Sequence, residues 1–356
     1  EELLAVVLLL PLLHIDFRLP ASGVVSCSDA SERGAGVVVS NCLSSCGTEA
    51  LMRRLAAVPN IFRHRIGLME SCAGIGGARR GFELLGIVPA IYLVSEISED
   101  AVRVLVHQWP DTIWLGKMED VTSEALRPYA SGCPLLRAFF HFAGTPCPGF
   151  CRWNPFAEGK QYDESARLLE EFKRVSDVCK RVFSSCPVFD CEENVASMSQ
   201  ESCEWISEKV GRRPYCLDMS DLVEQRRRRY FWPNWEVHER STVKLEDRGH
   251  YVAVGLRPAS RLPTSAWIKP GWRVSPKLEA FPTLTRPCPV KTPRWRTPGV
   301  DKASRQALVA WRRDDHRRPP LHYEARMQLH KKASGKVRFK RVEENERIHF
   351  FETDHT

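Results

Sequence analysis

The chain has 356 residues, of which 43% are hydrophobic and 27% charged, and its formal net charge is +8. These values are ordinary for a soluble globular protein with a sizeable core, and they exclude a collagen, a wholly disordered chain and a membrane bundle. The longest apolar run, Leu3 to Leu13, is broken by Pro11 and is too short to span a bilayer. It follows two acidic residues, which is unlike a signal peptide, and the absence of an initial Met suggests a fragment of a longer protein.

Residues 1–64 differ in composition from the rest, being first apolar and then small and polar. Residues 23–31 predict a strand that ends in an acidic turn, and residues 34–40 predict a second strand. This pair resembles the opening hairpin of a ribonuclease-H-like module, in which Asp29 would be the first metal carboxylate. The other carboxylates of such a site cannot be placed before the next domain, so Asp29 is better explained as a turn residue. We interpret residues 1–64 as a remnant or as the tail of an upstream domain.

From Ile66 onward, strand-like and helix-like segments alternate along the chain. Such alternation favours a mostly parallel sheet covered by helices on both faces. After about residue 233 the density of Pro, Arg and Trp rises and the periodicity fades, which indicates a second, smaller region. The expected strands are residues 66–70, 91–94, 112–115, 137–142 and 188–191, and the expected helical segments are an amphipathic stretch to residue 85, residues 98–107 and residues 165–183.

The first strand leads into a glycine-rich turn, Cys72-Ala-Gly74-Ile-Gly76-Gly77-x3-Gly81. Glycines let the backbone turn sharply and approach a ligand closely, while the following helix offers its unpaired N–H groups. Glu96 ends the next expected strand, 22 residues after Gly74, where a carboxylate can bind the hydroxyl pair of a ribose. Together they favour a cofactor that contains a nucleoside.

Three further motifs follow expected strands. Cys147 lies on a proline-containing loop after an apolar strand, and Glu193 lies at the end of the strand after that. Arg227 and Arg229 belong to a strand-like run, Gln225 to Trp232, whose alternation sends both to one face. Singly, each has a simpler explanation: a buried structural cysteine, a solvated acidic turn and a basic surface.

The positive charge is concentrated near the C-terminus. Residues 291–341 contain 16 Lys and Arg against 4 Asp and Glu, a surplus of +12, so the remaining chain sums to −4. We call residues 291–341 the basic block. It suggests a polyanionic partner, most often nucleic acid, although a solvated basic tail explains the charge equally well.

The 13 cysteines form no CxxC pair, and the spacings at Cys42 and Cys46 and at Cys147 and Cys151 lack partner pairs for a zinc site. We therefore expect no metal and a reducing, intracellular environment.

In their order, these motifs resemble the DNA cytosine-5 methyltransferases. Tyr230-Phe-Trp-Pro-Asn234, and the spacing from Pro146-Cys147 to Asn154, are most similar to the animal de novo subgroup. Residues 281–286 resemble the family's ninth motif, and residues 344–351 resemble the segment before its last one. The other matching motifs are the glycine turn, Glu96, the Pro-Cys loop, Ser165-Ala-Arg-Leu168, Glu193-Asn-Val and Gln225-x-Arg-x-Arg.

The resemblance implies a class I S-adenosylmethionine-dependent methyltransferase, with a doubly wound α/β sheet that has one reversed edge strand. It divides the chain into the N-terminal segment 1–64, a catalytic domain 65–234, a target-recognition region 235–330 and the start of a return segment, 331–356. The implied reaction is methyl transfer to carbon 5 of cytosine in double-stranded DNA, in the nucleus if the source is eukaryotic, with no metal and no membrane. Oligomerisation is left open.

The resemblance also assigns roles to particular residues. Cys147 would add to carbon 6 of the base, Glu193 would hold N3 and the exocyclic amine, and Arg227 and Arg229 would orient the base. The basic block would contact DNA phosphates, with Arg312, Arg313, Arg317 and Arg318 as candidates. S-adenosylmethionine would be bound by Gly74, Ile75, Gly76, Gly77, Glu96, Met118 and Leu168.

The sequence departs from the family pattern at several places. Cys72 replaces the usual Phe, and Cys151 replaces a serine. Lys117 stands where an acid contacts the adenine amine, with acids only at Glu119 and Asp120, and the chain ends at residue 356 before the final motif. Two alternatives follow: an inactive relative that binds DNA or a partner methyltransferase, and an RNA cytosine-5 methyltransferase. The second lacks support because no Cys-Phe-Thr tripeptide follows Glu193-Asn-Val.

Overall fold

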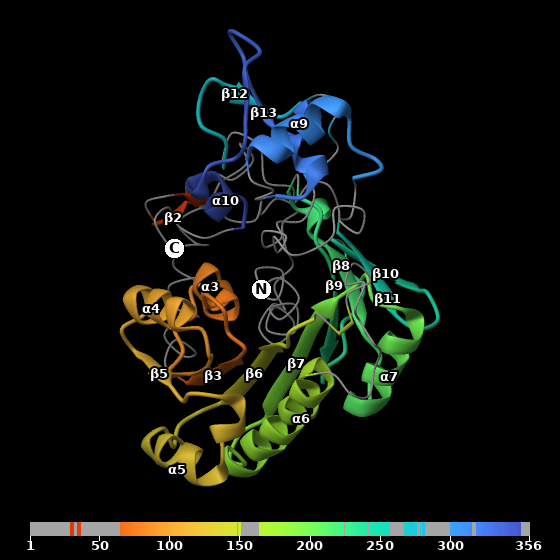
Figure 1. The fold of residues 1–356 in the computed structure, drawn as a ribbon. Helices are drawn as coiled ribbons and strands as arrows, with labels where there is room; N and C mark the ends of the chain where they lie inside the picture. Colours follow the sequence, from red (N-terminus) through yellow and green to blue (C-terminus); the bar gives the residue numbers. More distant parts are fainter. Residues whose placement is uncertain are drawn as a thin grey trace. The chain divides into compact units, whose positions relative to one another are not determined.

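The computed structural model describes residues 29–31, 34–36, 65–147, 149–150, 164–223, 225–240, 242–256, 267–275, 278, 280–281, 300–314 and 318–349 (Figure 1). The chain divides into two compact units. The sheet unit comprises Glu1–Leu217, Arg229–Gly255 and His355–Thr356, and the C-terminal unit comprises Asp218–Arg228 and Leu256–Asp354.

The expected N-terminal hairpin is described in part. Strand β1 (Asp29–Ser31) pairs antiparallel with β2 (Gly34–Gly36), and Asp29 faces Gly36 in the register. Asp29 is therefore the first residue of a strand. The remainder of the segments predicted at 23–31 and 34–40 lies outside the described residues.

A large sheet forms the centre of the sheet unit, and its first strands are parallel. The order in space is β10-β11-β8-β9-β7-β6-β3-β4-β5. The chain builds outward from β3 in one direction through β4 and β5, and then returns to the other side of β3 with β6 and β7. This confirms the doubly wound α/β fold. The parallel strands are β3 (Ile66–Ser71), β4 (Ile91–Ser95), β5 (Thr112–Trp114), β6 (Ala138–Gly144) and β7 (Val188–Val195).

The reversed strand is β9 (Arg228–Pro233), which pairs antiparallel with β7. The expectation that it forms an edge of the sheet is wrong, because β8 (Tyr215–Asp218) lies beyond it. Outside β8 come β11 (Val252–Leu256), parallel to it, and then β10 (Val243–Asp247). β11 therefore pairs with the backbone groups that β8 would otherwise expose, and β10 covers the outer edge of β11.

Helices cover both faces of the sheet, as the contacts of two adjacent residues of β6 show. On one face, Phe82 of α3 (Gly77–Leu84) packs on Phe140, with ring centres 5.2 Å apart. On the other, Phe172 of α6 (Glu164–Val182) lies 5.2 Å from the ring of His141. Adjacent strand residues point to opposite faces, so α3 and α6 lie on opposite sides. Within the described residues of this unit, the other α-helices are α4 (Glu99–Gln108), α5 (Ser123–Gly132) and α7 (Gln200–Val210).

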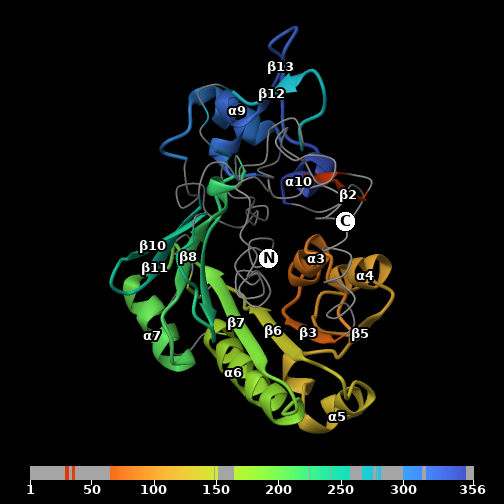
Figure 2. The same ribbon diagram turned by 180° about the vertical axis from the view of Figure 1, so that it is seen from behind.

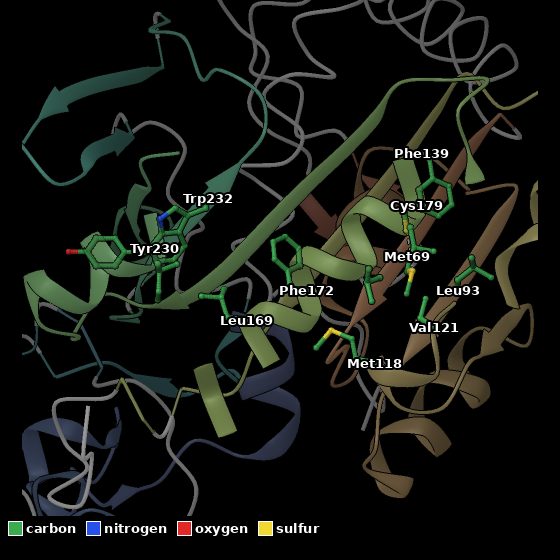
Figure 3. Close-up of a cluster of buried hydrophobic side chains, with 14 of the residues drawn as sticks. Met69, Leu93, Met118, Val121, Phe139, Leu169, Phe172, Cys179, Tyr230 and Trp232 are labelled. Carbon is green, nitrogen blue, oxygen red and sulfur yellow. Dashed lines mark hydrogen bonds between the residues drawn. The ribbon is translucent and has the colours of Figure 1, made fainter. Parts of the chain in front are cut away.

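The main core lies between the sheet and α6 (Figure 3). Met69 of β3, Leu93 of β4, Phe139 of β6 and Phe172 of α6 are at most 2% exposed. Burying side chains of this size is the main stabilising contribution to such a sheet. Among the described residues, no helix is both long and apolar enough to cross a bilayer.

The C-terminal unit holds a small sheet of β12 (Trp272–Arg273), β13 (Leu329–Lys331) and β14 (Val337–Arg338). Its helices include α9 (Arg305–Arg313) and α10 (Val342–Ile348), drawn in blue in Figure 2. Arg338 contacts both carboxylate oxygens of the buried Glu344, at 2.6 and 2.7 Å. Glu344 also accepts hydrogen bonds from the backbone N–H of Lys269 and Arg341, so its charge is fully compensated.

The buried His141 makes stability depend on pH. Its ring nitrogens lie 2.9 Å from the Ser71 and Ser176 hydroxyls, and burial lowers the pKa of His141 from 6.5 to about 4. The unfolded chain therefore binds a proton that the folded protein excludes, and stability should fall as the pH decreases from 6.5 to 4. The lost stabilisation is roughly 3 kcal/mol. The free energy of unfolding of His141→Gln, measured in urea, should not fall in this pH range. The same pH dependence in the wild type and in His141→Gln would contradict the low pKa of His141.

Candidate functional site

The glycine turn connects β3 to α3 at the point where the sheet changes direction. Cys72, Gly74 and Gly76 all have positive φ angles, of 52°, 56° and 86°. A Cβ atom on Gly76 would overlap the ring of Trp109, so only glycine fits there. Cys72 is the only described non-glycine residue with positive φ, a conformation that is costly and concentrates at functional sites.

Glu70 fixes the start of α3 and accepts from two of the N–H groups that the sequence expected this helix to offer to a ligand, so that expectation is wrong for these two groups. Its buried carboxylate accepts hydrogen bonds from the N–H groups of Ala78 and Arg79, at 3.0 and 2.8 Å, and from the Tyr92 hydroxyl at 2.7 Å. Burial raises the pKa of Glu70, against these hydrogen bonds. Sequence reasoning missed this residue, although an acid inside an apolar strand is a signal that could have singled it out.

The structure brings Glu96 to the glycine turn. One carboxylate oxygen accepts from the Gly74 N–H at 2.8 Å, and the other accepts from the N–H groups of Ile97 and Ser98. A carboxylate offers about four acceptor positions, so capacity remains for a ligand hydroxyl. Glu96 thus fixes the turn and can accept from a ribose.

After β5, Lys117 stands where the family pattern has an acid, and the nearby acids Glu119 and Asp120 make contacts within the protein. Lys117 is exposed, and its backbone N–H donates to the Asp120 carboxylate at 3.1 Å. Glu119 forms an ion pair with Arg167. Two predicted cofactor residues belong to the core: the Met118 side chain is 2% exposed, and Leu168 is half-buried against the same cluster.

Cys147 lies on the loop after β6. Its carbonyl accepts from the Phe150 N–H at 3.0 Å, and the Gly149 N–H donates to the Ser165 hydroxyl at the start of α6, at 3.2 Å. The thiol is half-buried and packs against the core. These bonds fix the loop at the carboxyl end of a parallel strand. Cys151 and Asn154 lie outside the described residues.

Glu193 lies inside β7, so the prediction that the strand ends at residue 191 and that Glu193 lies at its end is wrong. β7 continues to Val195 because β9 pairs with it along this length, with Glu193 opposite Phe231. On the other side Glu193 pairs with Gly144 of β6. The Glu193 side chain is 8% exposed, and its Oε1 lies 2.6 Å from the Arg229 Nε. The acid is therefore held by two strands and paired with a cation.

Arg227 and Arg229 do not belong to the same element of secondary structure. β9 begins at Arg228, so Arg229 belongs to the strand and Arg227 does not. The strand thus starts later than predicted, and alternation along it cannot place Arg227. The Arg227 N–H donates to the Asp218 carboxylate at 3.0 Å, within the C-terminal unit.

One hollow reaches from the start of the glycine turn to Glu193. It extends between the end of β3, the start of α3 and the ends of β6 and β7, which are the carboxyl edges at the sheet's switch point. It is lined by Glu70, Ser71, Cys72, Ala73, Ala78, Phe142, Gly144 and Glu193. The start of the glycine turn and Glu193 therefore border the same hollow. In the described part of the chain, no cluster of His, Cys, Asp and Glu could hold a metal ion.

The predicted phosphate-binding arginines differ in their surroundings. Arg312 and Arg313 are exposed in the last turn of α9, where a cation is favoured by the helix dipole. Arg318 pairs with Asp314 at 3.1 Å and lies over the Phe339 ring, 4.2 Å from its centre. Arg317 lies outside the described residues.

No protein-family model matches the chain. The Dnmt2 methyltransferase of S. pombe is similar over 49% of this chain, with 16% identity and a TM-score of 0.32, and the match covers 51% of that protein, about half its length. A triple mutant of DNMT2 from Spodoptera frugiperda matches 81% of this chain and 96% of its own, with 13% identity and a TM-score of 0.40.

The methyltransferase EhMeth of Entamoeba histolytica matches 82% of this chain and 88% of its own, with 13% identity and a TM-score of 0.47. In this chain itself, the strand order β5-β4-β3-β6-β7-β9-β8, with β9 antiparallel to β7, is that of a class I S-adenosylmethionine-dependent methyltransferase fold.

Proposed function

We propose that this protein transfers a methyl group from S-adenosylmethionine to carbon 5 of cytosine in DNA, through a covalent adduct with Cys147. The hollow shared by the glycine turn and Glu193 carries this proposal, because it links a cofactor position to a base position. The intracellular site of action would be the nucleus in a eukaryotic cell.

The cofactor would lie along Gly74, Ile75, Gly76 and Gly77. Glu96 retains acceptor capacity for a ribose, so it fits this group. The Ala78 and Arg79 N–H groups of α3 donate to Glu70 and would not contact the cofactor. When bound, S-adenosylmethionine supplies an electrophilic methyl group. Met118 and Leu168 would support the pocket from the core.

The chain's own residues can make cytosine reactive. The thiolate of Cys147 would form a bond with carbon 6, which gives carbon 5 the electron density to accept the methyl group. Glu193, held by Arg229, would bind the N3 edge and stabilise the charge that develops there. A water molecule acting as base would then take the carbon 5 proton, the carbon 5–carbon 6 double bond would re-form, and the bond between sulfur and carbon 6 would break to release Cys147 as the thiolate. Arg227 would orient the base or the adjacent phosphate.

The target base must leave the duplex to reach this hollow, because a stacked base cannot be approached. The basic block would supply phosphate contacts that do not depend on sequence. Double-stranded DNA is therefore the proposed partner.

The decisive test is transfer of a labelled methyl group to matched double-stranded DNA and RNA of the same sequence. We expect the label in 5-methylcytosine of the DNA, and none with Cys147→Ala. Label in RNA alone would assign the alternative substrate. Cofactor and DNA binding without any transfer would identify an inactive relative.

Reversing the exposed charges of α9 tests the basic block. The double variant Arg312→Glu/Arg313→Glu should lower the log–log salt dependence of DNA affinity by about 2, if each arginine meets one phosphate. Fluorescence anisotropy over a salt series measures this slope. The matched control is Arg127→Glu/Arg181→Glu, which reverses two exposed arginines of the sheet unit. Equal slopes in both variants would show that α9 does not contact DNA.

A further inference from the structure

A second carboxyl group, Glu192, lies beside Glu193 and has no place in the proposed chemistry. Consecutive strand residues point to opposite faces, so Glu192 faces away from the hollow that Glu193 lines. Glu192 is fully buried. A buried acid next to a catalytic one calls for a physical explanation, because burial without partners is costly.

Thr145 is the residue that Glu192 contacts. The Thr145 hydroxyl bonds to the Glu192 Oε1, which also lies 3.4 Å from the Thr145 N–H. Asn194, two residues further along β7, donates to the Thr145 carbonyl and hydroxyl, each at 3.2 Å. The hydroxyl thus accepts from Asn194 and donates to Glu192, which fixes its direction. Only Pro146 separates Thr145 from Cys147.

We propose that Glu192 is a positioning residue that fixes, through Thr145, the loop presenting Cys147 to the base. This inference rests on the proposed function. β7 then does two tasks with adjacent side chains: Glu193 binds the base on one face, and Glu192 with Asn194 anchors the nucleophile loop on the other. The base and the Cys147 loop are thus both held by β7, so this one rigid strand sets the distance between them.

The surroundings indicate that Glu192 performs this task as a neutral acid. Burial, together with the charge of Glu193, raises its pKa well above the usual value. Hydrogen bonds from Thr145 and Asn194 lower the pKa of Glu192 but do not offset its burial. No geometrically normal hydrogen bond reaches the second oxygen, Oε2, from the described residues, which disfavours a charged carboxylate. A glutamine has the same shape and keeps the acceptor that Thr145 uses. Glutamine should therefore rescue the function that alanine loses.

The experiment compares Thr145→Val, Thr145→Ser, Glu192→Ala and Glu192→Gln. Valine keeps the shape of threonine and removes the hydroxyl, so kcat should fall by roughly 100-fold, the cost of a nucleophile displaced by about 1 Å. S-adenosylmethionine affinity by calorimetry should stay the same, because the glycine turn is untouched. Serine and glutamine should restore most of kcat. Ser176→Ala is the matched control, since it removes a buried hydroxyl that bonds to His141 instead of this loop.

Hydrogen exchange separates this inference from the proposed function. In Thr145→Val and Glu192→Ala, the N–H groups of Thr145, Gly149 and Phe150 should exchange faster than in the wild type and in Glu192→Gln, even if no substrate is ever methylated. A wild type that binds cofactor and transfers nothing would overturn the proposed function alone. The positioning role would be overturned if Thr145→Val kept full kcat and loop protection, or if Glu192→Gln behaved like Glu192→Ala.

Discussion

Cys147→Ala is expected to abolish the covalent complex with DNA that contains 5-fluorocytosine. The thiol of Cys147 would bond to carbon 6, and fluorine at carbon 5 then prevents the proton loss that releases the base. The wild type should therefore accumulate an adduct on a denaturing gel in the presence of S-adenosylmethionine. Removing a covalent nucleophile costs roughly 10⁴-fold or more in turnover, so no band should remain in the variant.

The control for this experiment is Cys133→Ala. Cys133 is also half-buried and packs against the same core cluster, but it lies at the C-cap of α5, before β6, and not on the loop after β6. The adduct should form normally in that variant. An undiminished adduct in Cys147→Ala would exclude Cys147 as the nucleophile and make Cys151 the next candidate.

Arg338→Ala is expected to destabilise the C-terminal unit by about 3 kcal/mol, the cost of leaving a buried charge without its partner. Glu344 is 1% exposed, and Arg338 is the cation that contacts both of its oxygens. Hydrogen exchange of β13, β14 and α10 should report the loss, while the amides of β3 and β6 should be unaffected. The matched control is Arg213→Ala, whose partner Asp247 is exposed, so its loss should change stability far less.

The pH dependence of this destabilisation supplies a second check. Burial opposes the charge of Glu344, but Arg338 and the backbone N–H groups outweigh it and hold the pKa of Glu344 below its usual 4.5. The stabilisation is therefore present above pH 4.5 and is lost as the pH falls through the folded pKa. The difference between the wild type and Arg338→Ala should shrink on acidification, and a constant difference would show that lost packing on the Trp272 ring is the cause.

Local sequence patterns predicted the central strands and the helices next to them. The strand expected at 66–70 is β3, Ile66–Ser71, and the helix expected at 98–107 is α4, Glu99–Gln108, where Ser98 caps the first turn. These elements are fixed by short apolar runs and by a capping side chain, which are local properties. The glycine turn and Glu96 were also predicted from local patterns, because each follows a short apolar strand.

Non-local pairing explains what the sequence did not predict. Nothing near Glu193 indicates that β7 continues through it; the continuation depends on β9, more than thirty residues later in the chain. The roles of Glu70 and Glu192 also come from partners outside their own strands, such as Tyr92 and Thr145. A single sequence does not show which distant groups will bury a carboxylate.

The position of β6 between β3 and β7 limits how this protein can vary. Ser71 pairs with Ala143, and Gly144 pairs with Glu193, so one strand sets the separation between the glycine turn and Glu193. Deleting one residue from Ala138–Gly144 would exchange its faces and bring His141 to the side of α3. Changes in chain length are therefore expected in the loops, and a one-residue insertion inside β6 should disturb the hollow between the glycine turn and Glu193.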